Sequence, residues 1–342
     1  MKEINFESQA AKLEKFYSGF TATHLIHIGD KLGLFEVLND NKEGLTTSAL
    51  ASELGLHEPY IKIWCQTALY LGILDCDEGG KFKFQPYMNE ILGDKSNFRN
   101  MLGRFNSLVN VTGERFKKSI VLYRTGETLG EYNPQFSEIV AEATKPFHTY
   151  LNVYFKKLPN INPIKQMLEE GINFLDIGCG SGRLIIQLAA LFPNSQFTGV
   201  DPSIYGINVA TKNVEQLGLT DRVFVENLGG EELQYKKKFE IACMTLVFHE
   251  INPIIRFKVL ENIYKALKKD GHLILFDFSY PERFDDFKNP NYGSTIIHQF
   301  NETSLGAVFL TLTEQNEMFA KVGFKDIQRI TLKGIDIINA VK

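Results

Sequence analysis

Apolar and polar positions alternate differently in the two parts of the chain. In the first 100 or so residues, apolar side chains recur every three or four positions, as at Leu25, Ile28, Leu32 and Phe35. This is the spacing of a helix that packs one face against a core. From about residue 161 onward, short apolar runs alternate with amphipathic segments. The pattern predicts a helical part followed by an α/β part, in which a parallel sheet carries helices on both faces.

Within the first part, the pattern predicts a winged helix-turn-helix. One helix within 46–56 opens on capping residues and stops at a glycine, and a second helix occupies about 59–70. The segments 71–74 and 81–84 flank a polar turn, and the second of them alternates apolar with polar residues. These two segments predict a short β-wing.

A winged helix-turn-helix can bind DNA, but the charge of this one argues against it. The 59–70 helix, which would enter the major groove, carries Lys62 as its only cation, and residues 1–120 contain 14 Lys and Arg against 15 Asp and Glu. Without a basic face, the release of counterions from DNA supplies little binding energy. We therefore expect no nucleic-acid partner, and a winged-helix regulator that only senses a ligand is the alternative.

The second part predicts alternating elements and a terminal hairpin. Because strands and helices follow one another in turn, the strands are expected to form a doubly wound sheet. The last two strands are close enough in sequence to pair as an antiparallel hairpin. The predicted strands cover 174–177, 196–200, 222–226, 239–245, 272–278, 325–331 and 335–341, and the helices that follow the second, fourth and fifth strands cover 205–217, 253–267 and 314–322.

Length and composition fit a globular protein of two domains. The chain has 342 residues, of which 44% are hydrophobic and 23% charged, with a formal net charge of −4. We expect domains at 1–100 and 161–342, joined by a helical connector at 101–160. No apolar run approaches the roughly 18 residues that cross a membrane, so we expect no membrane partner and a cytoplasmic location. The four cysteines form no CxxC pair, which argues against a disulfide framework or a zinc site.

The stretch that follows the first strand of the second part carries the clearest chemical motif. An apolar strand ends in Asp176, and Gly178, Gly180 and Gly182 follow at every second position. Glycines let the backbone turn sharply and approach a ligand where a Cβ would collide. The first N–H groups of the next helix then point at the polar group that occupies the turn. We therefore expect Asp176 and the three glycines to bind a cofactor.

Two further residues extend this expected cofactor site. Asp201 ends the next strand, about 20 residues past the glycine turn, where a pair of ribose hydroxyls would need an acceptor. Asn227 follows the third strand and could bind the adenine amino edge, although either of the next two residues could occupy that position instead. A nicotinamide-binding fingerprint would place its third glycine at the position of Arg183, so a dinucleotide is disfavoured.

The motif Asp-x-Gly-x-Gly-x-Gly at the end of an apolar strand resembles the first motif of the class I S-adenosylmethionine-dependent methyltransferases. The segments 32–38, 50–56 and 68–74 are similar to the N-terminal domain of the winged-helix small-molecule O-methyltransferases, and the terminal hairpin looks like the antiparallel seventh strand of their fold. The resemblance implies a Rossmann-like class I methyltransferase sheet behind a mostly α-helical winged-helix domain. It also implies S-adenosyl-L-methionine as cofactor, a small-molecule acceptor and a homodimer.

Methyl transfer from a sulfonium requires an acceptor that is held in line, deprotonated and shielded from water. His249, after the fourth strand, is the best candidate base, since an imidazole titrates near neutral pH. The segment 248–251 also resembles the His-Asp-Trp motif of the family, whose histidine is its general base, although the last two positions differ here. Asp277 falls where the family places an acid that orients the base. The family's second orienting acid has no clear match at 310–312.

Other roles for these residues stay open. His249 could be a structural histidine near a helix start, and Asp277 could be a strand-end acid that faces cofactor or solvent. Both could ligate a metal ion together with His298, but the three residues are far apart and show no local ligand spacing, so we expect no metal. Oxygen is the expected accepting atom, and carbon, nitrogen and sulfur are the alternatives.

The acceptor pocket has only scattered candidates. His148 and Tyr154 belong to the aromatic-rich connector. His298 lies in the segment 281–312, which is long and loop-like enough to fold over an active site. We expect these three side chains to contact the acceptor, whose identity the sequence does not indicate.

Overall fold

Contacts between residues divide the chain into two units. The computed structural model describes residues 4–97, 99–129, 144, 151, 155, 163–332 and 335–342. The first unit comprises Met1–Lys117 and Glu142–Pro146, and the second comprises Lys118–Ala141 and Phe147–Lys342. Two of the predicted pocket residues, His148 and Tyr154, lie outside the described residues.

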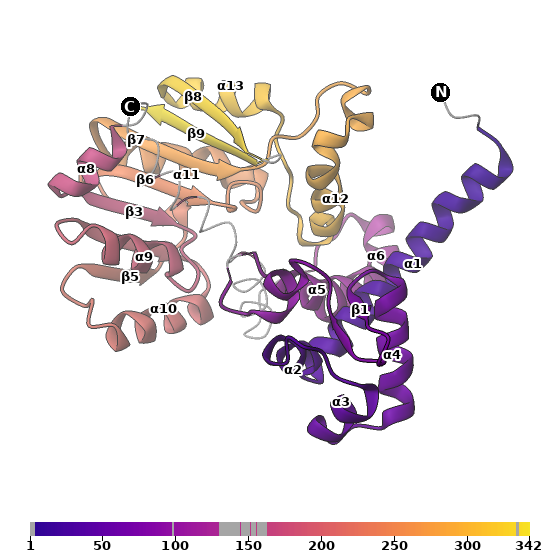
Figure 1. Cartoon of the computed structure of the whole chain (residues 1–342). Helices are drawn as coiled ribbons and strands as arrows, with labels where there is room; N and C mark the ends of the chain where they lie inside the picture. The colour runs from indigo at the N-terminus through magenta and orange to yellow at the C-terminus, as the bar shows by residue number, and fades with distance from the viewer. Residues whose placement is uncertain are drawn as a thin grey trace. The chain divides into compact units, whose positions relative to one another are not determined.

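The first unit consists of helices and one small antiparallel hairpin (Figure 1). Trp64 organises its core: the indole N–H donates to the carbonyl oxygen of Leu25 at 3.0 Å, and a Cβ on Gly29 would lie 2.6 Å from the indole ring. The elements are α1 (Phe6–Lys31), α2 (Leu34–Asp40), α3 (Thr47–Leu54), α4 (Glu58–Tyr70), β1 (Leu74–Cys76), β2 (Phe82–Phe84), α5 (Leu102–Ser107) and α6 (Gly113–Thr125), the last of which crosses into the second unit.

The predicted winged helix-turn-helix elements are present. The expected helices form as α3 and α4, and the expected wing forms as β1 and β2, with Leu74 opposite Phe84. The first wing strand begins later than expected. Gly72 has a left-handed φ of 70°, which ends the preceding helical turn and delays the strand.

The second unit is built on one seven-stranded sheet in the order β5-β4-β3-β6-β7-β9-β8. Strands β3 to β7 run parallel, and β9 is antiparallel to both of its neighbours. This arrangement confirms the predicted fold class, including the terminal hairpin. The elements are α8 (Ile164–Glu170), β3 (Asn173–Ile177), α9 (Arg183–Leu191), β4 (Gln196–Asp201), α10 (Ile204–Gln216), β5 (Val223–Asn227), β6 (Phe239–Thr245), α11 (Pro253–Ala266), β7 (Leu267–Asp277), α12 (Gly293–Glu302), α13 (Leu312–Val322), β8 (Lys325–Leu332) and β9 (Ile335–Val341).

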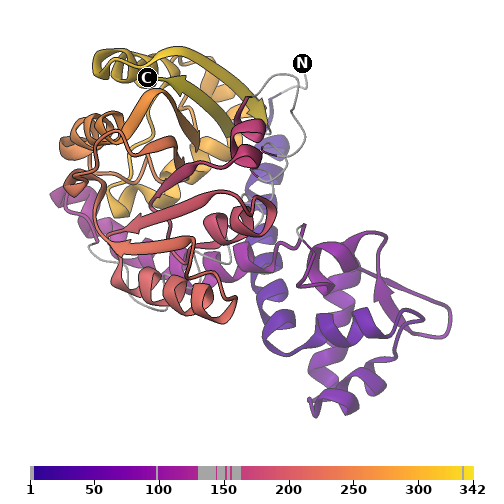
Figure 2. The same cartoon turned by 90° about the vertical axis from the view of Figure 1, so that its left-hand side faces the viewer.

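Helices cover both faces of this sheet (Figures 1 and 2). Phe174 points from β3 into a cluster built with side chains of α8, α9 and α10. Its neighbour Leu175 points into a second cluster, built with side chains of α11 and α13. Successive strand residues face opposite sides, so the near-continuous apolar run of β3 is explained by a sheet buried on both faces.

The strand order reverses between β3 and β6, and this position determines where a ligand can bind. Helices α9 and α11, which follow these two strands, lie on opposite faces of the sheet. In open α/β sheets, ligands bind outside the carboxyl ends of the strands at such a reversal. The glycine turn after β3 and the loop after β6 are therefore the segments that would border a ligand.

The segment 281–312 differs from its expected loop-like character, because ten of its residues form α12 (Gly293–Glu302). The residue before this helix, Tyr292, makes no side-chain cap, so the usual sequence signal for a helix start is missing.

Among the described residues, no helix has the length and apolar character needed to span a bilayer.

Candidate active site

The glycine turn after β3 combines a packing constraint with an open backbone. Gly178 has a φ of +72°, and a Cβ there would lie 2.4 Å from Cγ2 of Val247 in the loop after β6. Gly180 has a φ of +52°, and a Cβ there would meet nothing within 4 Å. The first glycine is therefore needed for packing, whereas the second exposes backbone that a ligand can approach.

Asp201 connects the end of β4 to this turn. Its Oδ2 accepts a hydrogen bond from the N–H of Gly180 at 2.8 Å, and its Oδ1 accepts one from the N–H of Ser203 at 2.8 Å. Burial raises the pKa of Asp201, and the two N–H groups oppose this rise. Each carboxylate oxygen has a second lone pair, which matches the need of two neighbouring ribose hydroxyls.

Asp176 lies deeper in the sheet than the turn that follows it. The side chain is 2% exposed, and its residue pairs with Gly199 on β4 and Cys243 on β6. Burial, followed by the charge of Asp201, raises the pKa of Asp176 well above its ordinary value. The structure thus brings Asp176 and Asp201 close enough together for their charges to interact.

Asn227, at the end of β5, holds the backbone that follows β4. Its Nδ2 donates to the carbonyl oxygens of Asp201 and Pro202, at 3.0 and 2.9 Å. Because the amide nitrogen is engaged, Oδ1 is the atom that this side chain can offer to a ligand. An oxygen acceptor is what an adenine amino group requires.

The glycine turn also has a partner that the sequence analysis missed. A Cβ on Gly206, in the first turn of α10, would lie 3.1 Å from the backbone carbonyl carbon and oxygen of Gly180. The close approach of α10 to the turn explains the glycine. A lone glycine in a helical segment gave no signal that distinguished this role.

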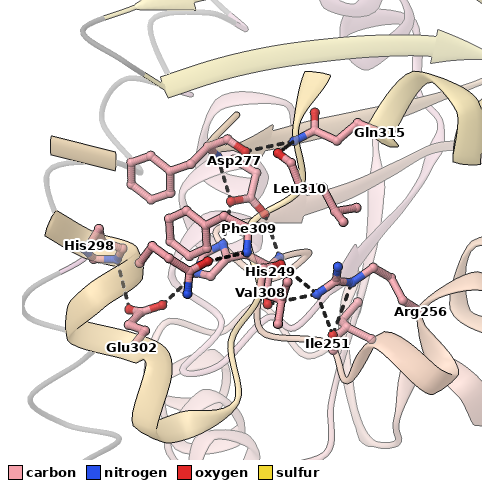
Figure 3. Close-up of polar contacts among 12 residues, drawn as sticks. His249, Ile251, Arg256, Asp277, His298, Glu302, Val308, Phe309, Leu310 and Gln315 are labelled. Atoms are coloured by element: carbon pink, nitrogen blue, oxygen red, sulfur yellow. Dashed lines mark hydrogen bonds and ion pairs between the residues drawn. The ribbon is translucent and has the colours of Figure 1, made fainter. Parts of the chain in front are cut away.

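His249 and Asp277 form a buried pair at the ends of β6 and β7 (Figure 3). Nδ1 of His249 lies 2.5 Å from Oδ1 of Asp277, and the backbone N–H of His249 donates to Oδ2 at 3.1 Å. Asp277 Oδ1 also accepts from the N–H of Phe278 at 2.7 Å. The carboxylate therefore fixes the orientation of the ring and directs Nε2 to the opposite side.

On that opposite side stands Glu302, which the sequence analysis did not single out. Its Oε2 lies 3.1 Å from Nε2 of His249, and its Oε1 lies 2.9 Å from Nε2 of His298, one helical turn earlier on α12 (Figure 3). The four-residue spacing of His298 and Glu302 places them on one helix face. That spacing could have been noticed in the sequence if the helix had been recognised.

Neighbouring charges shift the pKa values of His249 and Glu302. Burial alone would lower the pKa of His249, but the charges and hydrogen bonds of Asp277 and Glu302 outweigh burial and raise it well above its ordinary value. Burial would raise the pKa of Glu302, but its contacts with His249 and His298 lower it overall. The two carboxylates therefore favour the protonated form of the His249 imidazole, and burial opposes them.

Apolar rings and one buried cation complete the surroundings of His249. The ring centroids of Phe309 and Phe278 lie 4.4 and 5.9 Å from that of His249. Arg256, which is 1% exposed, donates from Nη2 to the carbonyl oxygens of His249, Ile251 and Val308 at 3.1, 2.8 and 3.0 Å (Figure 3). Arg256 thus holds the backbone on both sides of the imidazole. Its hydrogen bonds go to carbonyl oxygens, whereas the carboxylates of Asp277 and Glu302 contact the histidines.

Two sets of side chains therefore border the ends of the central strands. The first set surrounds the glycine turn and offers backbone N–H groups, carboxylate oxygens and an amide. The second set is centred on His249 and offers two imidazoles and a carboxylate within 4.8 Å of one another, a group that could hold a metal ion. Val247 links the two sets, since it lies against Gly178 and two residues before His249.

Comparison with known proteins identifies the second unit. A family model described as a methyltransferase domain matches residues 168–322. The bifunctional methyltransferase of Rickettsia bellii is 27% identical over 195 residues, which cover 47% of this chain and 35% of that longer protein. The whole-protein activity of that relative is therefore not transferred.

Two of the proteins that are similar over nearly the full length of this chain are both methyltransferases. The phenazine O-methyltransferase PhzM of Lysobacter antibioticus is 22% identical over 339 residues, covering 96% of this chain and 95% of that protein. The structure of human N-acetylserotonin methyltransferase in complex with S-adenosylmethionine superimposes with a TM-score of 0.73 at 15% identity, covering 100% of this chain and 99% of that one. These matches confirm the expected fold.

Proposed function

Since this chain belongs to the S-adenosylmethionine-dependent methyltransferases, we propose that it transfers the methyl group of S-adenosylmethionine to an oxygen of a small molecule. The observation that carries this proposal is the buried His249–Asp277 pair, which lies beside the glycine turn at the carboxyl ends of the central strands. An oriented imidazole next to a sulfonium site is suited to an acceptor that must lose a proton, as a hydroxyl does.

The cofactor would bind along the glycine turn. Gly180 and the start of α9 would face its amino-acid end with backbone N–H groups. The second lone pairs of Asp201 would accept the ribose hydroxyls, and Oδ1 of Asn227 would accept the adenine amino group. The buried Asp176 would support the turn from the end of β3. Gly178 and Gly182 would form its two ends.

The proton of the acceptor would leave at His249. As the acceptor oxygen bonds to the methyl carbon, the carbon–sulfur bond breaks, the sulfur keeps its electron pair, and the hydroxyl proton passes to Nε2. Asp277 would stabilise the imidazolium that forms. Because Glu302 now occupies the Nε2 side at 3.1 Å, its carboxylate has to move toward His298 when an acceptor enters.

A binding titration tests this proposal before the acceptor is known. We expect the purified chain to bind S-adenosylmethionine and its demethylated product by calorimetry, and a screen of phenols and other small hydroxylated molecules to yield a methylated ether by mass spectrometry. Absence of affinity for both cofactor forms would overturn the proposal. Methylation of carbon, nitrogen or sulfur alone would leave the cofactor site intact and reject the oxygen acceptor.

Homodimer formation is part of the same proposal, and apolar side chains on α1 support it. Leu13, Phe16, Tyr17 and Phe20 are between 66% and 72% exposed and recur at three- and four-residue intervals, so they share one helix face. A second copy of this chain would cover that face, which sedimentation equilibrium can measure. The cytoplasmic location, the domain boundaries and the pocket roles of His148, Tyr154 and His298 stay predictions.

A further inference from the structure

A base that takes a proton in every methyl transfer has to lose it again, and the burial of His249 makes this loss difficult. The residue is 3% exposed, so bulk water has little access to the ring. Its Nε2 faces the carboxylate of Glu302, which in turn contacts His298 (Figure 3). We propose that Glu302 and His298 form a relay that carries this proton from His249 to solvent. The relay rests on the proposed function, in which His249 takes the proton of the acceptor.

His249, Glu302 and His298 form a row that runs from the interior to the surface. Their side chains are 3%, 14% and 37% exposed, in that order. The contacts along the row measure 3.1 Å from Nε2 of His249 to Oε2 of Glu302, and 2.9 Å from Oε1 of Glu302 to Nε2 of His298. Both distances are in the range of hydrogen bonds. A proton can therefore travel along the row in two short steps and reach a ring that solvent contacts.

Among the described residues, the opposite side of the His249 ring offers no comparable exit. Asp277, which contacts Nδ1, is 1% exposed and also accepts hydrogen bonds from the backbone N–H groups of His249 and Phe278. Arg256 is close by, but a guanidinium stays charged and accepts no proton. A proton given to Asp277 would therefore stay in the interior, whereas one given to Glu302 lies next to a partly exposed imidazole.

Aromatic rings enclose the row and leave the carboxylate as the link between the two imidazoles. The ring centroids of Phe309 and Phe278 lie 4.4 and 5.9 Å from that of His249, and 5.8 and 5.0 Å from that of His298. Phenyl rings cannot carry a proton. Oε2 of Glu302 is buried and accepts no hydrogen bond from another described residue, so it is available to the proton of His249.

The transfer would begin once the methylated product has left and Glu302 has returned to Nε2 of His249. The N–H bond at Nε2 breaks, the nitrogen keeps the electron pair, and Oε2 takes the proton. A half-turn of the carboxyl group about its Cγ–Cδ bond brings this proton to Nε2 of His298, which releases a proton to water. Glu302 is then a carboxylate again and His249 a neutral base, so no further reactant is consumed.

The charges along the row favour passage of the proton over its storage on Glu302. Burial would raise the pKa of Glu302, but its contacts with the two histidines lower it overall. The carboxyl group therefore holds the proton only during the transfer. Uptake of the acceptor proton requires Glu302 to be away from Nε2, whereas release requires it to be in contact. A chain without the relay should thus complete one methyl transfer and then slow down.

The first test measures proton exchange and needs no acceptor. In the full chain with isotopically labelled histidine, NMR records how fast the ring N–H protons of His249 exchange with water. We expect exchange to slow by about 10²-fold in both Glu302→Gln and His298→Gln, the size typical of losing a positioned acid–base group. Imidazole added to the buffer should restore part of the exchange in His298→Gln, because a small base can then take the proton from Glu302.

A matched control is available in the same unit. His272→Gln alters a buried histidine of β7 that contacts Asn339 and lies outside the row, so exchange at His249 should stay as in the parent chain. Urea unfolding of each variant reports its fold. A variant that keeps the parent's stability but exchanges slowly has lost the proton path and not its structure.

The second test uses turnover with an acceptor from the screen. Rapid-quench kinetics separate the first methyl transfer from the later ones. In His298→Gln, the first transfer should keep the parent's rate and appear as a burst of product, while later turnovers slow down and recover when imidazole is added. A purely structural role of His298 would give no burst and no recovery.

The outcomes separate the relay from the proposed function. Unchanged exchange in both Glu302→Gln and His298→Gln overturns the relay and leaves methyl transfer with His249 as the base. Exchange that slows in Glu302→Gln alone shows that the proton leaves directly from Glu302, which rejects the step to His298. Exchange that slows in both variants of a chain that binds neither cofactor form supports the proton path and overturns the proposed function alone.

Discussion

The two sets of side chains at the sheet edge are built in opposite ways. The set around the glycine turn, which we propose binds the methyl donor and call the donor side, takes Asp176, the glycines and Asp201 from two adjacent strands and fixes them through backbone hydrogen bonds. The set around His249, which we propose faces the methyl acceptor and call the acceptor side, takes His249, Asp277 and Glu302 from three segments that meet only in the folded unit. The donor side is therefore a local motif, whereas the acceptor side depends on tertiary packing.

The largest effect should separate the two sides in turnover. We expect His249→Ala to lower turnover by about 10²–10⁴-fold, since the base that takes the proton of the acceptor is lost, while the affinity for S-adenosylhomocysteine stays unchanged. Mass spectrometry of the methylated product measures the first quantity and calorimetry the second. An equal loss in both would mean that the two sides are not independent.

Gly178 tests the contact that joins the sides. Gly178→Ala should lower the free energy of unfolding by about 2–4 kcal/mol, because a left-handed φ and a collision with Val247 act together. Gly180→Ala is the matched control, with a left-handed φ but open space, and should cost about 1–2 kcal/mol. Urea unfolding measures both. Equal losses would show that the collision is relieved by a small shift of the loop.

Asp201 tests the donor side alone. Asp201→Ala should weaken binding of S-adenosylmethionine by about 1.5–3 kcal/mol, the size of a lost charge-assisted hydrogen bond. Because Asp201 also holds the N–H of Gly180, the open end of the turn should loosen as well. Calorimetry measures the dissociation constant, and an unchanged value would remove Asp201 from the ribose role.

The smallest effect is expected at Asn227. Asn227→Ala should weaken cofactor binding by about 0.5–1.5 kcal/mol, because two hydrogen bonds to the backbone after β4 are lost. Asn227→Asp keeps an oxygen acceptor and removes only the amide donor. If the oxygen contacts the cofactor, the Asp variant should bind it more tightly than the Ala variant, and equal affinities would assign Asn227 a purely structural role.

Sequence reasoning predicted the fold correctly, and it singled out the residues around the glycine turn, because both depend on local patterns. Strand periodicity, the spaced glycines and an acid at the end of the next strand are all readable within 174–201. The same reasoning singled out His249 and Asp277 as candidates, since they lie at or shortly after the ends of strands whose carboxyl ends share one edge of the sheet.

Sequence reasoning did not single out Glu302, for two physical reasons. Helix α12 lacks a side-chain N-cap, so the helix that aligns His298 with Glu302 was not recognised. The distance from Glu302 to His249 depends on the path of the chain after β7, and hydrogen bonds of Gln299 to the backbone of Ala307 and Phe309 set that path. Sequence spacing contains no information on such a contact.

Val247 packs against Gly178 and so connects the glycine turn with the loop that carries His249. Its side chain fills the space that a missing Cβ leaves, and the imidazole of His249 follows two residues later on the same loop. A bulkier residue at 247 would press on the glycine turn and displace the histidine at the same time. We therefore expect substitutions that change which acceptor is methylated to be tolerated far more readily on α12 than at Val247.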